Sequence, residues 1–498
     1  MPKRAGTILL ALPPRDPAMP AYRWLGEALR AAVLDGRLRP GARLRATRDL
    51  AGSYGLARGT IITAFAQLRA EGYIAGRVGS GTYVSRVLPD YLLQAPRAET
   101  VRQAPPAGRR RHRSAFARRV RPFPDLSLAP ARAFRTDQPA LDRFPAKLWA
   151  QLAARRLRRV TTSQLQGSGP LGYPPLQQAV ADYLRTSRGV RCTAGQVVIV
   201  SGVQQALDLA ARLLLDPGDR VCIENPGYPG AALVFEAYGA RIAAVPVDDE
   251  GMRVPDGRLQ RVRLAYTTPG HQFPLGVTMS LRRRLALLEW ARRGGALLFE
   301  DDYDSEYRYA GRPMPALQGL DRHGLVLFAG SFSKVLFPSL RLGYLVLPED
   351  LVDPVRAALS ISTRHAPLLD QAVLCDFITQ GHFGRHLRRM REEYAQRRAA
   401  LLEGVRERLA GSLEIIGVEA GLQAAGWLAG GRRAVAAAQA AARRHIEVTP
   451  LDRYYRGAVR RQGLQLGFAA VDTQEIQRGV RELAAVLQGG DADGDHRR

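Results

Sequence analysis

Amine chemistry in this chain depends on very few residues. Only three lysines, Lys3, Lys147 and Lys334, stand among 73 basic residues. Lys334 has the most informative surroundings, Gly330-Ser331-Phe332-Ser333-Lys334, directly after the apolar run 326–328. A lysine amine can form a Schiff base with an aldehyde cofactor, commonly pyridoxal phosphate, whereas a guanidinium stays protonated and is a poor nucleophile. Lys334 is therefore the candidate for holding such a cofactor, although Lys3 and Lys147 are kept as well.

A phosphate group needs backbone N–H groups at a helix start, hydroxyls and a cation. The segment 201–205 follows a strand-like run and opens a helical pattern, and small hydroxyl residues precede Lys334. We therefore predict a phosphate site in which residues 201–205 supply the N–H groups, and Ser331, Ser333 and Arg341 supply the hydroxyls and the cation.

The pyridine nitrogen of that cofactor needs a carboxylate, and its ring needs a flat partner. The acidic run Glu300-Asp301-Asp302-Tyr303-Asp304 follows a strand that ends at Phe299, and it is the natural source of the carboxylate. The same run could instead form a magnesium site or a solvated loop. Tyr228, which follows another strand, could cover the ring or simply pack in the core.

The elements that must position these groups alternate between two patterns. Strands are predicted by short apolar runs at 197–200, 220–223, 263–266, 296–299 and 324–328. Helices between them are predicted by helical spacing at 204–215 and 281–292. Such alternation is typical of an α/β fold with a mostly parallel sheet, whose strand ends bind ligands. A smaller C-terminal α+β part is expected to have helices near 371–409, 432–444 and 474–487.

The segment 20–85 has a different pattern. Apolar residues from Trp24 to Val33 have helical spacing. A second helix is expected to begin near Thr47, a possible N-cap, and a third to cover 57–71. Strand-like pieces follow at 73–75 and 82–84. Three helices and a hairpin describe a winged helix-turn-helix. The second helix of that motif meets DNA bases with its N-terminal end. The residues expected at the DNA are Arg48, Arg58, Gly59, Thr60 and the hairpin residues Arg77, Gly79 and Gly81.

The net charge of +27 favours a polyanionic partner for that segment. The alternative is a structural three-helix module whose arginines are merely solvated. Between the two patterned regions, residues 97–121 hold nine arginines and one acidic residue, which is typical of a flexible linker and could also contact phosphates. The predicted domains are 18–86, a linker over 87–140, a large domain over 141–490 and a tail over 491–498.

Composition excludes several classes of protein. Cys192, Cys222 and Cys375 are far apart, which argues against a disulfide scaffold or a cysteine zinc cluster and fits a reducing compartment. No stretch reaches the roughly 18 apolar residues of a membrane span, and the N-terminal apolar run 7–12 is too short for a signal peptide. We therefore expect a cytoplasmic protein with no membrane partner and no metal site.

The order of residues in the N-terminal segment resembles the GntR-type winged helix. The resemblance rests on the runs 38–44, 47–51, 58–60, 68–73 and 79–84. It implies that Arg48, Arg58, Thr60 and Gly79 contact DNA. Two departures are Arg45-Ala46, where the family has a proline, and Ala57, where it has a serine or threonine.

From Phe144 to Leu487 the chain resembles fold type I aminotransferases. The resemblance rests on the runs 169–173, 214–219, 268–276, 300–309, 331–344 and 466–469. Together with the GntR-type domain it is the combination found in the MocR family of transcriptional regulators. It implies pyridoxal 5'-phosphate as the cofactor, Lys334 as the Schiff-base lysine, Asp301 on the pyridine nitrogen, Tyr303 on the phenolic oxygen and Tyr228 stacked on the ring. It also implies that the phosphate is held by Gly202, Val203, Gln204, Ser331, Ser333 and Arg341. His271 would line the site or make a structural hydrogen bond.

Two positions depart from the aminotransferase pattern. Gln465 stands where aminotransferases have the arginine that binds the substrate carboxylate, and Gly230 stands where some regulators of the family have an arginine. Nearby arginines that could substitute are Arg453, Arg456, Arg460 and Arg461.

Three functions are compatible with the sequence. The first is a DNA-binding transcriptional regulator, a head-to-tail homodimer, that senses an amino compound or pyridoxal phosphate itself. The second is an active aminotransferase with a tethered DNA-binding domain. The third is a nonspecific nucleic-acid binder whose large domain is inert. The missing carboxylate arginine argues against the second, and the specific motifs argue against the third.

Overall fold

The computed structural model describes residues 10–77, 81–87, 112–123, 129–136, 138–257, 259–310 and 314–489. The chain divides into two compact units between Arg111 and His112. None of the helices in these residues is both long and apolar enough to cross a membrane.

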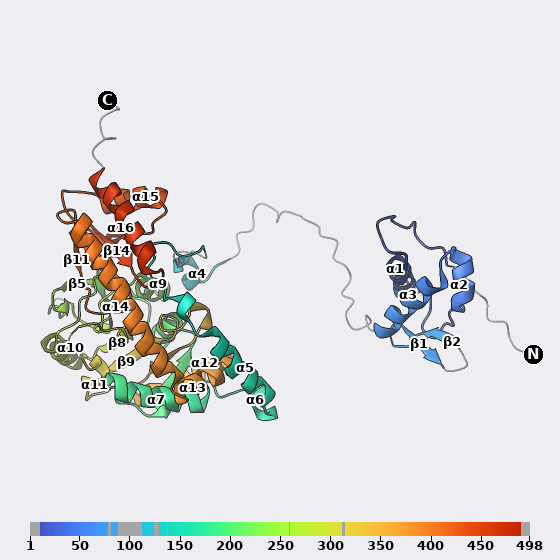
Figure 1. The fold of residues 1–498 in the computed structure, drawn as a ribbon. Helices are drawn as coiled ribbons and strands as arrows, with labels where there is room; N and C mark the ends of the chain where they lie inside the picture. The colour runs from blue at the N-terminus through green and yellow to red at the C-terminus, as the bar shows by residue number, and fades with distance from the viewer. Residues whose placement is uncertain are drawn as a thin grey trace, which may run out of the picture. The chain divides into compact units, whose positions relative to one another are not determined.

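The N-terminal unit is the expected three-helix domain with a hairpin (Figure 1). Its elements are α1 (Ala21–Leu34), α2 (Thr47–Tyr54), α3 (Arg58–Ala70) and the antiparallel strands β1 (Ile74–Arg77) and β2 (Gly81–Val84). Leu25, Ile61 and Phe65 are buried between the helices. One detail of the prediction is wrong: Thr47 is already helical, and the N-cap is Ala46, which has no hydroxyl to accept a capping hydrogen bond.

The larger unit is built on an eight-stranded sheet, which confirms the predicted, mostly parallel α/β fold. Strands β5, β4, β7, β8 and β9 are parallel neighbours, whereas β10 runs antiparallel to both β9 and β3, and β6 is antiparallel to β5. In sheet order the strands are β3 (Val197–Val200), β10 (Gly343–Val346), β9 (Val326–Ser331), β8 (Leu297–Asp302), β7 (Val262–Thr267), β4 (Arg220–Asn225), β5 (Arg241–Asp248) and β6 (Gly251–Met252).

Helices cover both faces of this sheet. Val326 and Phe328 of β9 point to one face, while Leu327 and Ala329 point to the other, as the two-residue period of a strand requires. The first face is covered by α7 (Pro174–Arg188), α10 (Leu281–Gly294) and α13 (Leu368–Thr379). The second is covered by α8 (Val203–Leu214), α9 (Pro229–Ala237) and α12 (Glu349–Ser362).

The C-terminal part is a smaller antiparallel sheet with helices, as expected. The strand order is β11 (Leu413–Ile416), β12 (Gln423–Leu428), β14 (Gly463–Gly467) and β13 (Thr449–Pro450). Its helices are α14 (His382–Arg408), α15 (Ala434–Arg443) and α16 (Thr473–Gln488). The single helix predicted over 371–409 is in fact α13 and α14, because Gly381 adopts a left-handed φ of 76° and interrupts the helix.

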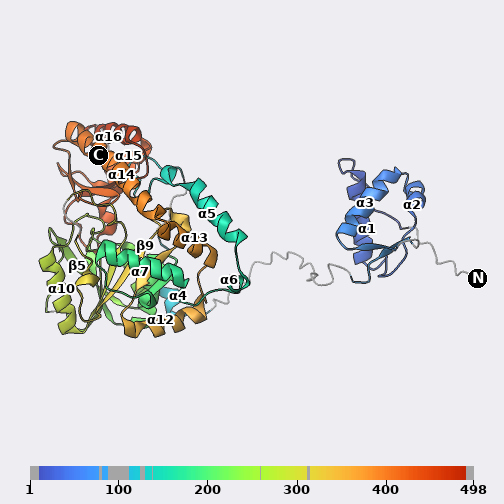
Figure 2. The ribbon, with the colours of Figure 1, turned by 60° about the horizontal axis from the view of Figure 1, so that its bottom comes forward.

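Short elements complete the larger unit. The helices α5 (Ala146–Arg158) and α6 (Thr162–Gln166) precede α7, and α11 (Leu317–Leu320) precedes β9. Figure 2 shows α5 beside α13, and the two helices are in contact. Single 3₁₀ turns lie at Leu141–Arg143, Ala194–Gln196, Pro338–Leu340 and Leu451–Tyr454.

The structure describes part of the predicted linker 87–140. Residues 88–111 lie outside the described residues, but residues 112–123 pack against the larger unit and include α4 (Ala115–Arg119). The Phe116 ring lies 5.2 Å from that of Tyr238, and Arg119 Nε donates to the carbonyl of Ala237 over 3.1 Å. Phe116 and Arg119 therefore anchor this end of the arginine-rich stretch to α9 and its C-terminal end.

Candidate cofactor site and DNA-binding surface

The predicted phosphate residues meet at the ends of three adjacent strands. Ser331 of β9 and Val200 of β3 both lie opposite Gly343 of β10. A Cβ atom on Gly343 would lie 2.7 Å from the Gly330 carbonyl oxygen and 3.1 Å from Gly202 Cα. Only glycine permits this approach, so it brings the segment after β9 close to the start of α8.

Hydrogen-bond donors suited to an anion lie near the end of β9 and the start of α8. Gly202, with a φ of 121°, caps α8, and the first N–H groups of a helix have no intrahelical partner. The guanidinium of Arg341 lies 3.7 Å from the point where a Gly202 Cβ would stand. Ser333 N donates to Ser331 Oγ over 3.2 Å, while Ser333 Oγ is buried without a hydrogen-bond partner. A helix terminus, hydroxyls and a guanidinium therefore converge, which fits a phosphate group.

Strand alternation selects one carboxylate from the acidic run. Asp301 points to the same face of the sheet as Tyr266, whose Oη donates to Asp301 Oδ2 over 2.7 Å. Burial raises the pKa of Asp301 to about 7, against the opposing effects of the Tyr266 hydrogen bond and the Lys334 ammonium. Asp301 Oδ1 is buried and has no hydrogen-bond partner. A protonated ring nitrogen would supply both the missing hydrogen bond and a compensating positive charge.

The neighbouring carboxylates point the other way. Glu300 accepts from the backbone N–H groups of Leu317 and Gln318, each over 2.8 Å, and Asp302 pairs with Arg188 at 2.9 Å. The acidic run is thus divided between two faces of the sheet. No group of three or more His, Cys, Asp and Glu residues that could hold a metal ion occurs in the part of the chain that the structure describes.

Tyr228 lies beside the phosphate residues. Its Oη accepts from Gln204 Nε2 over 2.8 Å, so a residue of the first turn of α8 fixes the ring. The ring stacks on Tyr266 at a centroid distance of 6.4 Å and meets Phe273 edge-on at 5.6 Å. The side chain therefore packs in an aromatic cluster and at the same time borders the candidate cofactor site.

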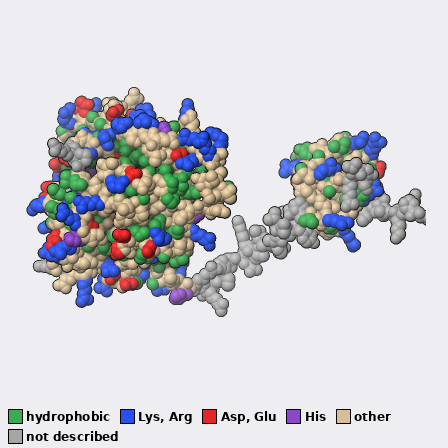
Figure 3. All heavy atoms as spheres, turned by 90° about the horizontal axis from the view of Figure 1, so that it is seen from below, with side chains coloured by type: hydrophobic (Ala, Val, Ile, Leu, Met, Phe, Trp, Pro, Cys, Tyr) green, Lys and Arg blue, Asp and Glu red, His purple; other side chains and the backbone are tan. Residues whose placement is uncertain are grey.

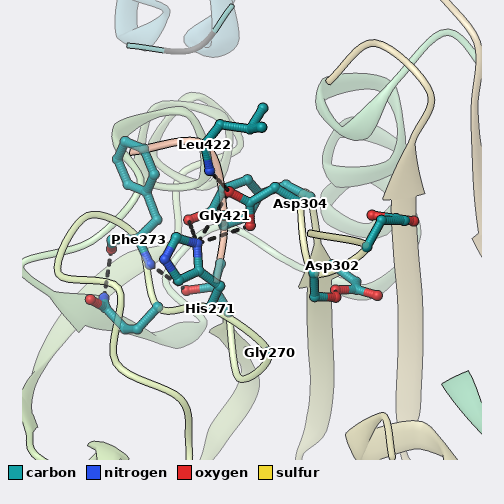
Figure 4. A network of polar contacts seen from close by, with 12 residues as sticks. Gly270, His271, Phe273, Asp302, Asp304, Gly421 and Leu422 are labelled. Carbon is teal, nitrogen blue, oxygen red and sulfur yellow. Dashed lines mark hydrogen bonds and ion pairs between the residues drawn. The ribbon is translucent and has the colours of Figure 1, made fainter. Parts of the chain in front are cut away.

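His271 belongs to a buried network between the two parts of the larger unit (Figure 4). Its Nδ1 lies 2.9 Å from Asp304 Oδ1 and 3.0 Å from Tyr303 Oη, while its Nε2 is buried without a partner. Asp304 Oδ2 also accepts from Leu422 N, just before β12. His271 thus has the structural hydrogen bond that the sequence left open, and it also orients Tyr303.

Sequence reasoning missed Tyr266, Phe273 and Tyr454. Phe273 lies 5.0 Å from Tyr454 and 5.9 Å from Tyr303, centroid to centroid. Tyr454 Oη donates to Gln465 Oε1 over 2.7 Å. Strand alternation put Tyr266 on one face of its strand, but nothing in the sequence indicated which face carries the site.

The four arginines considered as carboxylate ligands all lie on the surface. Arg453 and Arg460 are exposed, Arg456 pairs with Glu236, and Arg461 pairs with Glu414 at 2.6 Å and lies over the Trp427 ring. They therefore do not replace the missing arginine at Gln465.

In the N-terminal unit the expected DNA-contacting residues belong to two helix starts and to the hairpin. Arg58 is the first residue of α3, and Arg48, Arg58 and Gly59 are exposed, with Thr60 half-buried behind them. Gly81 begins β2 with a φ of 105°. Arg77 ends β1 but its side chain is not described, and Gly79 lies outside the described residues.

Comparison with known proteins gives the same two parts. The model of bacterial regulatory proteins of the gntR family matches residues 21–84, and that of aminotransferases class I and II matches residues 138–483. The probable rhizopine catabolism regulatory protein MocR of Rhizobium meliloti is 39% identical over 95% of both chains. The pyridoxine biosynthesis transcriptional regulator PdxR of Corynebacterium glutamicum is 29% identical over 95% of this chain and 97% of its own length.

Solved structures resemble the larger unit. An archaeal alanine:glyoxylate aminotransferase matches 73% of this chain and 92% of its own, with a TM-score of 0.69 and 29% identity. The α-aminoadipate aminotransferase LysN of Thermus thermophilus, solved with a phosphopyridoxyl-leucine adduct, matches 76% of this chain and 97% of its own, with a TM-score of 0.67 and 29% identity.

Proposed function

Because the chain belongs to the MocR family of transcriptional regulators, we propose that its larger unit holds pyridoxal phosphate on Lys334 and senses a small molecule there. The observation that carries the proposal is the buried Asp301 with one unused oxygen beside a helix-start phosphate cradle. The ligand sensed is an amino compound or pyridoxal phosphate itself, and the response is a change in affinity for operator DNA.

Each side chain has a role that follows from its position. Arg341, Ser331, Ser333 and the start of α8 would bind the phosphate, and Tyr228 would cover the ring. Asp301 would hold the proton of the ring nitrogen, which lets the bound cofactor act as an electron sink. Tyr303, oriented by His271, would donate to the phenolic oxygen.

The surface of the larger unit supports a homodimer. Figure 3 shows hydrophobic side chains gathered on the face that it presents. Leu157, Leu165, Ile361 and Leu369 are exposed on α5, α6, α12 and α13. These elements adjoin, because α5 packs on α13, and Gly167 lies against His365 between α12 and α13. Exposed apolar clusters of this kind mark interaction sites, and a second copy in head-to-tail arrangement is the proposed occupant.

The second candidate is an active aminotransferase with a tethered DNA-binding domain. The likeness to solved aminotransferases favours it. The uncharged Gln465 and Gly230 oppose it, because neither can bind a substrate carboxylate as an arginine would. Steady transamination at ordinary enzyme rates, without sequence-specific DNA binding, would establish this second function instead.

The test is a titration of the purified full-length protein with pyridoxal phosphate, followed by near-visible absorbance and by binding to its own promoter DNA. Two matched variants separate the activities. Lys334→Ala should lose the bound-cofactor band and keep DNA affinity in the absence of cofactor. Arg58→Ala should keep the band and lose about tenfold or more in DNA affinity, the usual cost of a base or phosphate contact at a recognition helix. A band that survives in Lys334→Ala would refute the proposal.

A further inference from the structure

Gln465 faces the candidate cofactor site from the smaller sheet. It lies in β14 between Ala425 of β12 and Thr449 of β13, and cross-strand partners point to the same face of a sheet. Ala425 packs with Phe273 and Tyr454, and Tyr228 and Tyr303 pack against the same cluster. The amide of Gln465 is therefore directed toward the residues proposed to surround the cofactor ring.

The hydrogen bonding of this amide is incomplete. Gln465 is fully buried, at 0% exposure, and its Oε1 accepts from Tyr454 Oη. Its Nε2 is buried and has no hydrogen-bond partner. A buried donor left unsatisfied costs about 1–3 kcal/mol, so this N–H favours a ligand with an acceptor oxygen.

The position two residues after Tyr228 offers no charge and no room for one. A Cβ atom on Gly230 would lie 2.1 Å from Gln204 Nε2 and 2.6 Å from the Tyr228 ring. An arginine there would break the Gln204–Tyr228 hydrogen bond. The four arginines near Gln465 in sequence are on the surface. None of these positions gives a carboxylate buried beside Gln465 a counter-charge, and an uncompensated buried charge costs several kcal/mol.

We propose that the ligand sensed at this site is a primary amine that carries neutral hydroxyl or amide oxygens and no acidic group, such as an amino alcohol or an amino sugar. Gln465 Nε2 donates to its neutral oxygen. The ligand's amine would exchange with the Lys334 amine at the aldehyde carbon of the cofactor, so that one carbon–nitrogen bond forms as the other breaks and Lys334 is released as the free amine. This inference rests on the proposed function, since it requires the cofactor.

The experiment compares matched amines on the cofactor-loaded full-length protein. Each pair consists of an amino alcohol and the amino acid that has a carboxylate in place of one CH2OH group. The pairs are alaninol with alanine, serinol with serine, and propanolamine with β-alanine. The concentration that half-saturates the change in cofactor absorbance is measured for each. We expect the alcohol of each pair to act at a concentration about tenfold or more below that of its acid, because only the acid buries an unpaired charge. Glucosamine serves as an additional neutral probe.

Variants at one position test the cause. Gln465→Arg should reverse the preference in favour of the acids, and Gln465→Leu should weaken the alcohols about tenfold without helping the acids. Gln474→Arg, which adds the same charge at an exposed position of α16, should keep the preference of the unaltered protein. Because Gln465→Leu adds no charge, it remains informative if Gln465→Arg does not fold.

The outcomes separate this inference from the proposed function. Absence of a Lys334-dependent absorbance band would refute the proposed function. A band that acids change as readily as alcohols, or that no amine changes while pyridoxal phosphate alone alters DNA affinity, would refute the neutral-amine ligand and leave the cofactor site standing.

Discussion

Asp301 illustrates how burial gives one carboxylate of an acidic run its chemical character. Its neighbours Glu300 and Asp302 receive backbone N–H groups or a guanidinium, whereas Asp301 has only the Tyr266 hydroxyl. Its raised pKa therefore reflects burial, which the Tyr266 hydrogen bond and the Lys334 charge offset only in part. A cofactor with a protonated ring nitrogen would reverse that balance.

This gives a prediction about pH and stability for the cofactor-free protein. The pKa of Asp301 is about 7 in the folded chain and about 3.9 when unfolded. Between these values the unfolded chain has released its proton while the folded chain retains it, so the free energy of unfolding falls as pH rises through that window. Between pH 5 and pH 7, Asp301→Asn should therefore lose about 2 kcal/mol less unfolding free energy than the unaltered protein.

Urea unfolding at both pH values measures this difference. The pKa of Asp302 is likewise raised to about 7 by burial, and it contributes to the unaltered protein and the variant alike. Identical pH dependence in the two proteins would show that Asp301 does not retain its proton.

At the scale of elements, glycines decide where helices and strands end and how closely they approach. Gly381 separates α13 from α14, and Gly343 brings Gly202 toward Ser331. Gly421, before β12, has a φ of 81°, and a Cβ there would lie 2.1 Å from the His271 ring and 2.5 Å from Asp304. The smaller sheet can therefore dock on the His271–Asp304 pair only through glycine.

Gly421→Ala should consequently be strongly destabilising. The left-handed backbone alone costs alanine about 1–2 kcal/mol, and overlap with the buried pair adds to it, for a total of about 3 kcal/mol or more. Gly411→Ala is the matched control, because Gly411 has a φ of 77° but no atom within 4 Å of the added Cβ. Equal losses of unfolding free energy in the two variants would mean that the close approach at Gly421 contributes nothing.

At the scale of the whole molecule, the end of the arginine-rich stretch is tied to the candidate site. Phe123 lies 6.2 Å, ring to ring, from Tyr228, and Phe116 and Arg119 contact α9, which begins directly after Tyr228. A ligand that shifts Tyr228 would therefore act on the segment that leads back toward the N-terminal unit. Coupling requires that the two states of this contact differ in free energy.

Phe123→Ala should uncouple the two activities. We expect it to keep the Lys334-dependent absorbance band and the DNA affinity of the cofactor-free protein. The change in DNA affinity on ligand binding should fall about fivefold or more, within the usual range of coupling energies. Absorbance and DNA titrations on the same sample measure both. Leu285→Ala, an exposed apolar truncation on α10, is the control. Full coupling in Phe123→Ala would exclude this contact as the route.

Much of the architecture followed from the sequence, because it is encoded locally. Alternating apolar runs fixed the strands and helices of the larger unit, and the spacing in 20–85 fixed the winged helix. The motifs around Lys334, Asp301 and Arg341 were sufficient to predict a cofactor site, since residues at the ends of parallel strands gather at one edge of a sheet. The family comparisons confirm the fold and the family.

Only the tertiary structure decided what depends on contacts between distant segments. It determined that Asp301 shares a face with Tyr266, that residues 112–123 pack on α9, and that Tyr454, hydrogen-bonded to Gln465, packs on Phe273. These partners are separated by tens to hundreds of residues, and period and composition carry no information about such distances. Local pattern thus determines which elements form, whereas burial and charge pairing after folding determine which side chains are left to bind a ligand.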